Sequence, residues 1–135
     1  MSNGLYDNAR ALFATAGINF GSDTIKVYLC PATYTVNLST HVYLTDMTGA
    51  CTPVAGHVTL GTKTTTAGAC GAANSTFSAV SGAQVTSIVI YKDTGTAGTS
   101  PLIAYIDTAT GLPITPNGGD IIVAWDTGTN KIFRL

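Results

Sequence analysis

Short apolar stretches that alternate with polar residues follow one another from residue 23 to the end of the chain. A period of two is typical of a strand with one buried face, because successive side chains point to opposite sides of a sheet. The inward positions would be Ile25, Val27 and Leu29 in residues 24–30, Val42 and Leu44 in residues 41–47, and Val58 and Leu60 in residues 54–60. We therefore predict a strand in each of these segments.

Two later segments, residues 83–93 and 100–107, are apolar on both faces and predict central strands. The last segment, residues 118–135, predicts a hairpin whose final strand covers residues 132–135. Strands that recur at such short spacing, separated by segments rich in Gly, Pro and Thr, favour a β-sandwich.

Residues 1–20 follow a different period. Leu5, Ala9, Leu12, Phe13 and Ala16 recur at helical spacing, and Gly17 is a residue type that often ends a helix. The pattern predicts a short amphipathic helix over residues 5–16. Two alternatives remain open for it: the helix packs on the domain's own sheet, or it forms an arm that grips a neighbouring subunit.

Charged residues make up only 10% of the 135-residue chain, against about 25% in a typical soluble domain. All seven acidic residues are aspartates, so good helix formers are scarce, whereas Thr and β-branched apolar residues suit strands. We predict an all-β fold: a single antiparallel β-sandwich, jelly-roll-like, with a short N-terminal helix or arm. The arm would cover residues 1–20 and the β-sandwich domain residues 21–135.

The net charge is −1, and the lysines are scattered singly along the chain. No basic stripe could neutralise a run of phosphates, so we predict no nucleic-acid partner and no membrane partner. The N-terminus lacks the features of a signal peptide, which favours folding in a cytoplasm. A surface with so little charge is unusual for a freely diffusing monomer. We expect copies of the chain or a larger particle to cover much of it.

Cys30, Cys51 and Cys70 are an odd number of cysteines without a C-x-x-C pair. Together with the widely separated His41 and His57 they do not form a zinc pattern. Cys30 ends an apolar strand and is predicted to be a buried small hydrophobe. Cys51 and Cys70 lie in loop-like segments and could pair, although a cytoplasmic origin favours free thiols.

Asp-Thr-Gly-Thr occurs at Asp93–Thr96 and again at Asp126–Thr129, and a related Asp-Thr-Ala-Thr lies at Asp107–Thr110. Aspartic proteases present each catalytic carboxylate on Asp-Thr-Gly after an apolar strand. However, the nine residues after Asp126 leave no room for the flap and the supporting strand, and nothing builds the shielded cleft in which two carboxylates share a proton. An Asp that accepts backbone N–H groups, followed by a Gly with positive φ, is typical of a turn. We predict three turns after strands.

Other catalytic patterns are missing as well. No Ser lies in a G-x-S-x-G elbow, and no acidic residue stands in a motif that would orient either histidine. A calcium site from Asp93, Asp107 and Asp126 would need their loops to meet at one end of the sandwich, without support from an EF-hand or an acidic repeat. We therefore predict that the protein is not an enzyme and has no catalytic residue, cofactor or metal.

Three stretches together resemble a family of small structural proteins encoded by tailed bacteriophages: NGLYDNARALF, DTIKVYLC…YTVNLSTHVYLTD and IVIYKDTGT…LIAYIDTATGLPITPNGGDIIVAWDTGTNKIFRL. The resemblance covers most of the chain and is most distinctive in its C-terminal part. The middle, with Cys51 and Cys70, departs from it. The family brings no catalytic residues.

The resemblance implies a virion component assembled in the cytoplasm of a bacterial host. A capsid decoration (cement) protein that binds and stabilises the outer shell is the favoured function. A tail or neck component and a carbohydrate-binding receptor module are the alternatives. The expected partners are the major capsid protein and copies of the chain itself, as a dimer or trimer. The candidate assembly contacts are Leu5, Tyr6, Leu12, Phe13 and Phe20.

Overall fold

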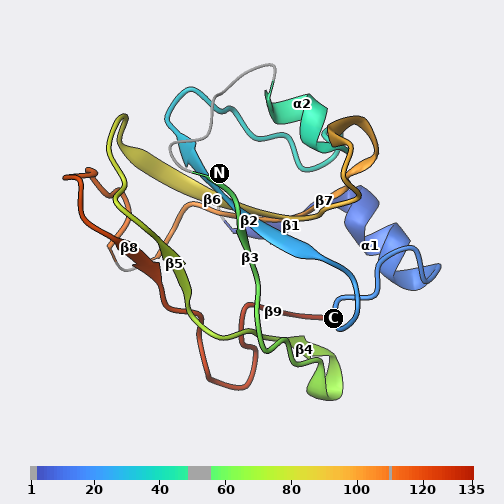
Figure 1. The fold of residues 1–135 in the computed structure, drawn as a ribbon. Helices are drawn as coiled ribbons and strands as arrows, with labels where there is room; N and C mark the ends of the chain where they lie inside the picture. The colour runs from blue at the N-terminus through green and yellow to red at the C-terminus, as the bar shows by residue number, and fades with distance from the viewer. Residues whose placement is uncertain (1–2, 49–55, 110) are drawn as a thin grey trace.

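A five-stranded antiparallel sheet runs through the middle of the molecule (Figure 1). The computed structural model describes residues 3–48, 56–109 and 111–135. Of these described residues, 31% lie in strands and 15% in helices, so the fold is mostly β. In spatial order the sheet consists of β1 (Gly4–Leu5), β7 (Leu102–Ile106), β6 (Val85–Lys92), β2 (Ile25–Pro31) and β3 (Val58–Thr59).

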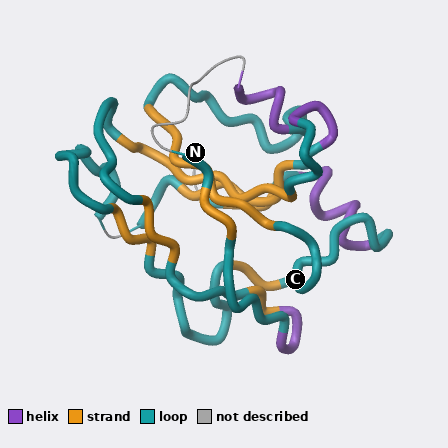
Figure 2. The backbone as a smooth tube through the Cα atoms, viewed as in Figure 1, coloured by secondary structure: helices purple, strands orange, loops and turns teal. Residues whose placement is uncertain are grey.

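The remaining strands form two short antiparallel ribbons, and long loops join most elements (Figure 2). One ribbon pairs β5 (Ser75–Phe77) with β8 (Ile121–Val123), and the other pairs β4 (Ala69–Cys70) with β9 (Phe133–Arg134). The helical elements are α1 (Asp7–Ala14), α2 (Leu44–Thr48) and the 3-10 turns η1 (Thr66–Gly68) and η2 (Ala97–Thr99).

The centre of the sheet is the pairing of β2 with β6, the two longest strands. Almost every residue of both strands is buried, as the apolar runs in β6 and β7 predicted. For β2 the prediction was incomplete. Ile25, Val27 and Leu29 do share one face, but Tyr28 and Cys30 on the other face are equally buried. β2 is therefore covered on both sides.

The two faces of this sheet differ in chemistry. Directly paired residues share a face, so the register places Val27 beside Ile90 and Leu29 beside Ile88. We call this side the apolar face; it carries Ile25, Val27, Leu29, Ile88 and Ile90. On the opposite side, Tyr28 lies beside Val89, which in turn lies beside Tyr105 of β7, and Tyr91 lies beside Lys26. We call the side that carries Tyr28, Tyr91 and Tyr105 the tyrosine face.

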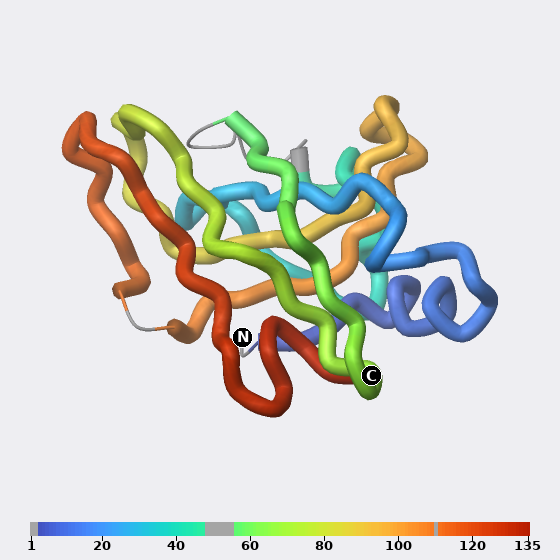
Figure 3. Tube along the Cα trace, turned by 60° about the horizontal axis from the view of Figure 1, so that its bottom comes forward, coloured from blue at the N-terminus to red at the C-terminus, as the bar shows by residue number. Residues whose placement is uncertain are grey.

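The two ribbons lie on the side of the apolar face, below the main sheet in Figure 1 and in front of it in Figure 3. They supply Phe77, Ile121 and the following Trp125 to the core. The predicted C-terminal hairpin is wrong, because β8 pairs with β5 and β9 pairs with β4 rather than with each other. Each C-terminal strand pairs with an earlier strand that has no other partner strand in the described part of the chain. This arrangement lets both ribbons bury side chains against the sheet.

Residues 32–48 cover the tyrosine face and lie above the sheet in Figure 1. The strand predicted over residues 41–47 is wrong, since the segment ends in the helix α2. The reason is local: the carboxylate of Asp46 accepts the N–H groups of Val42 at 2.7 Å and Tyr43 at 2.8 Å. An acidic side chain that reaches back to the start of a helix satisfies donors that no helical carbonyl can reach. Leu44 and Met47, three residues apart, then both point into the core.

The N-terminal segment packs on the domain's own sheet, the first of the two alternatives. β1 pairs with β7, and the N–H of Tyr6 donates to the carbonyl of Ile103 at 3.0 Å. α1 is shorter than the predicted helix, and its Ala9 is fully buried. Residues 4–20 thus contribute a strand, a helix and several core side chains to the same hydrophobic core as the rest of the chain.

Trp125 follows β8 and belongs to the core: Ile121 and Trp125 are buried, while Ile122 between them is 62% exposed. The indole Nε1–H donates to the Ser75 hydroxyl at 3.1 Å. We expect Trp125→Ala to lower the free energy of unfolding by ~3–5 kcal/mol, because it removes a large buried side chain. Trp125→Phe keeps a buried ring and loses the hydrogen bond, so it should cost about 1–2 kcal/mol. Urea unfolding followed by circular dichroism measures both, and an unchanged midpoint for Trp125→Ala would contradict the core role.

Candidate functional site

The five residues predicted as assembly contacts divide into two groups. Tyr6 and Phe20 are buried at 0% and 3% exposure and contribute to the chain's own core. Leu5, Leu12 and Phe13 are partly buried and pack against that core. Only the second group therefore offers accessible surface to another molecule while the domain stays folded.

The two Asp-Thr-Gly segments form turns, as predicted. In each, the carboxylate accepts the N–H of the glycine two residues later, Asp93 from Gly95 at 2.9 Å and Asp126 from Gly128 at 3.0 Å. Gly95 has the expected positive φ of 89°, whereas Gly128 is not among the residues with positive φ. The first turn leads through η2 into β7 and closes the β6–β7 hairpin. The second leads out of the β5–β8 ribbon toward β9.

At the third aspartate, Asp107, the backbone N–H groups bind a side chain from the N-terminal segment. The Asn3 side chain accepts the N–H groups of Asp107 at 2.9 Å and Thr108 at 3.0 Å, so the N-terminus ties down the end of β7. Thr110, the last residue of this predicted turn, lies outside the described residues. Within the described part of the chain, no three His, Cys or Asp side chains form a group that could hold a metal ion.

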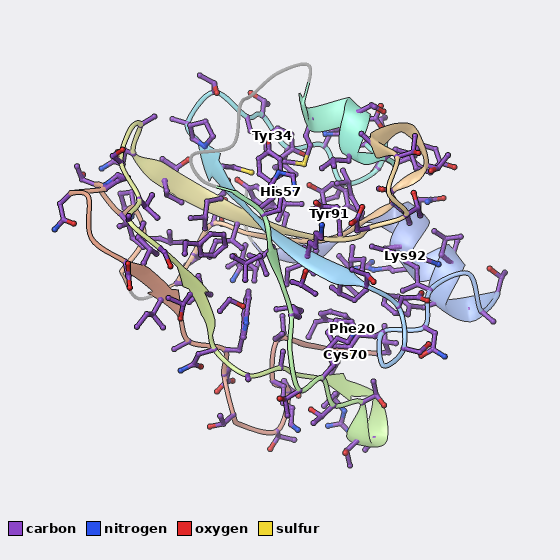
Figure 4. All side chains as sticks on the ribbon, in the orientation of Figure 1. Phe20, Tyr34, His57, Cys70, Tyr91 and Lys92 are labelled. Carbon is purple, nitrogen blue, oxygen red and sulfur yellow. The ribbon has the colours of Figure 1, made fainter. Side chains whose placement is uncertain are left out.

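A cluster of titratable side chains lies on the tyrosine face, where β3 reaches the end of β6. His57 Nδ1 is hydrogen-bonded to the hydroxyl of Tyr91, and the imidazole packs on the ring of Tyr28 with centroids 4.7 Å apart. Beside them, Lys26 Nζ and Asp93 Oδ2 form an ion pair at 2.9 Å. Figure 4 shows His57 and Tyr91 on the same side of the sheet as Tyr34.

The environment sets the protonation of this cluster. Burial lowers the pKa of His57 below its ordinary value of 6.5, the charge of Lys26 lowers it further, and Asp93 opposes both. Burial, together with the charge of Asp93, raises the pKa of Tyr91 to about 12. The hydrogen bond from Lys26 and that from Gly95 hold the pKa of Asp93 below its usual range. At neutral pH the pair is thus an uncharged imidazole bonded to an uncharged phenol, and raising the pKa of a phenol makes it a weaker acid.

A second tyrosine–histidine chain connects the N-terminus to the same face. Tyr6 and Tyr34 share a hydrogen bond of 2.8 Å between their hydroxyls, and Tyr34 bonds to His41 Nδ1 at 2.9 Å. The ring of Tyr34 also packs edge-on against Tyr105, with centroids 6.1 Å apart. Burial raises the pKa of Tyr6 well above the usual range of a phenol. These contacts join β1, the 32–41 loop and the sheet into one layer.

The aromatic cluster was missed in the sequence, where the tyrosines are spread over many segments. Five of the six tyrosines are buried on or against the tyrosine face, and only Tyr43 is substantially exposed, at 40%. The sequences of β2 and β6 do indicate a second set of apolar positions, because Tyr28 and Tyr91 alternate with the residues of the predicted core. This pattern could be used only with the register between the strands, which sequence periodicity does not give.

The four lysines all bind groups of the chain itself. Lys92 Nζ contacts Asp23 at 3.1 Å and the carbonyl of Gly17 at 3.0 Å, while Lys63 donates to the carbonyl of Asp23. Lys26 pairs with Asp93, and Lys131 donates to the Thr64 hydroxyl at 3.0 Å. The scattered lysines of the sequence therefore connect separate segments of the chain: Lys26 and Lys92 bind loop residues from the sheet, and Lys63 and Lys131 join one loop to another. Figure 4 labels Lys92 at the end of the sheet near α1.

Two cysteines are described, and both are buried thiols that form no disulfide with a described residue. Cys30 at the end of β2 confirms the prediction of a buried small hydrophobe. Burial raises the pKa of the Cys70 thiol, which reduces its reactivity at neutral pH. Cys51, its possible disulfide partner, lies outside the described residues.

The chain matches no protein-family model and no curated protein. Among the described residues, none of the helices has both the length and the apolar character needed to span a bilayer.

The two Asx turns give a direct test of the protease alternative. We expect Asp93→Ala and Asp126→Ala to cost ~0.5–2 kcal/mol each, because each removes the acceptor of a turn N–H. Asp93→Asn is the matched control, since an amide oxygen can still accept the Gly95 N–H. The wild type should not cleave unfolded casein in a pepstatin-sensitive manner at any pH. Cleavage that disappears in either alanine variant would show that the carboxylates are catalytic.

His57 should make the fold sensitive to mild acid. Its pKa is lowered in the folded state, so below about 6.5 the unfolded chain takes up the proton more readily and stability falls as the pH drops through the folded pKa. The lowered carboxylate pKa values of Asp23, Asp46 and Asp93 act only at more acidic pH. We expect the urea midpoint of the wild type to fall between pH 7 and pH 5, and His57→Gln to reduce that loss. Tyr91→Phe leaves the imidazole buried, so this variant should lose as much stability between pH 7 and pH 5 as the wild type. An equal loss in His57→Gln would assign the effect to other groups.

Proposed function

We propose that this chain is a non-enzymatic structural protein of a tailed-bacteriophage virion, and that it decorates the capsid and stabilises the shell. The observation that carries the proposal is the shortage of free charge on the surface. Only 10% of the residues are charged, and every lysine is bound to another part of the same chain. A surface of this kind is better suited to being covered by protein than to keeping a monomer apart from its neighbours.

The resemblance to phage structural proteins supports the same function through the parts of the chain that it covers. Its C-terminal stretch contains most of β6 and all of β7, β8 and β9, and thus parts of two strands of the central sheet and one strand of each ribbon. We interpret the two ribbons as a minimal second layer, so that the fold corresponds to a reduced, jelly-roll-like sandwich whose second sheet is split.

In this proposal, the partly buried Leu5, Leu12 and Phe13 contact the major capsid protein or another copy of the chain. The copies would form symmetric dimers or trimers over junctions of the capsid lattice. Tyr6 and Phe20 act indirectly, because they hold the N-terminal segment on the domain.

A position in the tail or neck is the alternative within the virion, and the copy number per virion distinguishes it from a position on the capsid.

A carbohydrate-binding module has less support, because such a site needs exposed aromatic rings. Trp125 is buried and bonded to Ser75, and Tyr43 is the one aromatic side chain in the described part that is classed as exposed.

The test of decoration is occupancy and effect on the particle. We expect the chain to be present in many copies per particle by quantitative mass spectrometry and by density over lattice junctions in cryo-microscopy. Particles that lack it should disassemble at a lower temperature, and purified chain added back should restore the loss. A copy number of only a few per virion would place the chain in the tail or neck.

A pair of matched variants tests the contact surface in the same experiment. Leu12→Ser changes a proposed contact, whereas Ile122→Ser removes an exposed apolar side chain from β8, on the opposite end of the chain. We expect Leu12→Ser to reduce occupancy and Ile122→Ser to leave it unchanged. Their melting temperatures show whether either substitution acts through unfolding, and equal occupancy would remove Leu12 from the contact.

A further inference from the structure

The two arginines of the chain differ from its lysines. Arg10 on α1 and Arg134 on β9 are both exposed, and neither guanidinium group forms a hydrogen bond or ion pair with any described residue. They are far apart in the sequence, yet both line one cleft of ≈ 310 Å³. The cations without a partner in the described structure are therefore gathered in one place.

The cleft lies along the edge of the main sheet. β1 is the outermost strand there, and the C-terminal residues that include β9 form the other wall. Polar and apolar groups line the cleft about equally, and its apolar part includes Leu5 from β1, Ile106 from β7 and the neighbouring pair Ile132 and Phe133. These four side chains are only partly buried, so the lining remains accessible.

The acidic residues near the cleft are engaged elsewhere or do not reach the arginines. Asp107 directly follows Ile106, but its carboxylate accepts the Thr108 hydroxyl at 2.9 Å. Asp7 lies three residues before Arg10 on α1, and no ion pair joins them. The cleft thus combines two positive charges with several apolar side chains, in a chain whose net charge is −1.

We propose that this cleft binds an acidic peptide segment of a protein partner. Its carboxylates would pair with the guanidinium groups of Arg10 and Arg134, and an adjacent apolar side chain would lie on Leu5, Ile106 and Phe133. Guanidinium groups suit carboxylates because they present several donors in a planar fork. A single phosphate or a nucleic acid would use the charges but would leave the apolar lining without a partner.

The proposal can be tested without a virion. The probe is an acetylated and amidated octapeptide in which Asp and Leu alternate, and its neutral twin carries Asn in place of Asp. The chain has only two arginines, so its nitrogen-15 spectrum contains two arginine Nε–Hε signals that report directly on the cleft. We expect the acidic peptide to shift both signals and the amides of Ile106 and Phe133 in a saturable manner, and the neutral twin to bind about tenfold more weakly or not at all.

Variants separate the site from general electrostatics. Arg10→Gln and Arg134→Gln should each weaken binding about tenfold, because each removes one charge-assisted contact. Arg134→Lys keeps the charge and should lose less. Lys63→Gln removes a positive charge outside the cleft and should leave the affinity unchanged, provided that its melting temperature shows an intact fold.

Three results would overturn the proposal. They are the absence of shifts at millimolar peptide, equal binding of the neutral twin, and binding of inorganic phosphate or an oligonucleotide at the cleft where the acidic peptide fails. The outcome is also independent of decoration. If the chain binds the peptide but is present in only a few copies per virion, the proposal for the cleft stands and the capsid position is rejected. If the Arg10→Gln, Arg134→Gln double variant still occupies the capsid fully, decoration stands and does not use the cleft.

Discussion

The pairing of β2 with β6 is the interaction on which the rest of the molecule depends. These are the longest strands, and they bury side chains on both faces. A sheet buried on both sides needs a layer over each, and this chain has few other long elements to supply them. It covers the apolar face with two short ribbons and the tyrosine face with a loop and a short helix. Neither ribbon would be stable alone, because an isolated two-stranded ribbon is marginal in water.

The two layers are attached by different forces. On the apolar face, attachment depends on burial, with the rings of Phe13 and Phe20 both packed on Phe133 from the last strand. On the tyrosine face, hydroxyl and imidazole groups must be paired when they are buried, which restricts the covering loop to one arrangement. The described structure meets this demand, since no buried side-chain nitrogen or oxygen within it lacks a partner. Tyrosines at these positions thus add directionality that phenylalanines would not.

The sequence predicted the elements that carry their own signal, and missed those that depend on distant partners. The long runs of β2, β6 and β7 and the carboxylate–glycine turns at Asp93 and Asp126 are local features, and periodicity or turn chemistry was enough to find them. The helix α2 was missed because the alternation of Val42 and Leu44 outweighed the spacing of Leu44 and Met47 and the position of Asp46. The pairing of β8 with β5 and of β9 with β4 had no local signal, since strands of two or three residues are defined by what they pair with. The tyrosine cluster and the arginine cleft likewise depend on register and chain crossing.

The distribution of charge follows from the same architecture. A domain with short strands and long loops needs contacts that hold the loops in place, and Lys63 and Lys92 provide them by meeting at Asp23. An exposed ion pair contributes little by itself, but an amine that also binds a buried or fixed carbonyl connects two segments of the chain. Once the lysines serve this purpose, few cations remain to face outward. Within the described residues, the guanidinium groups of Arg10 and Arg134 pair with no carboxylate, and both line the cleft at the edge of the sheet. Exposed guanidinium groups stay hydrated, so they need no partner within the fold and can bind one outside it.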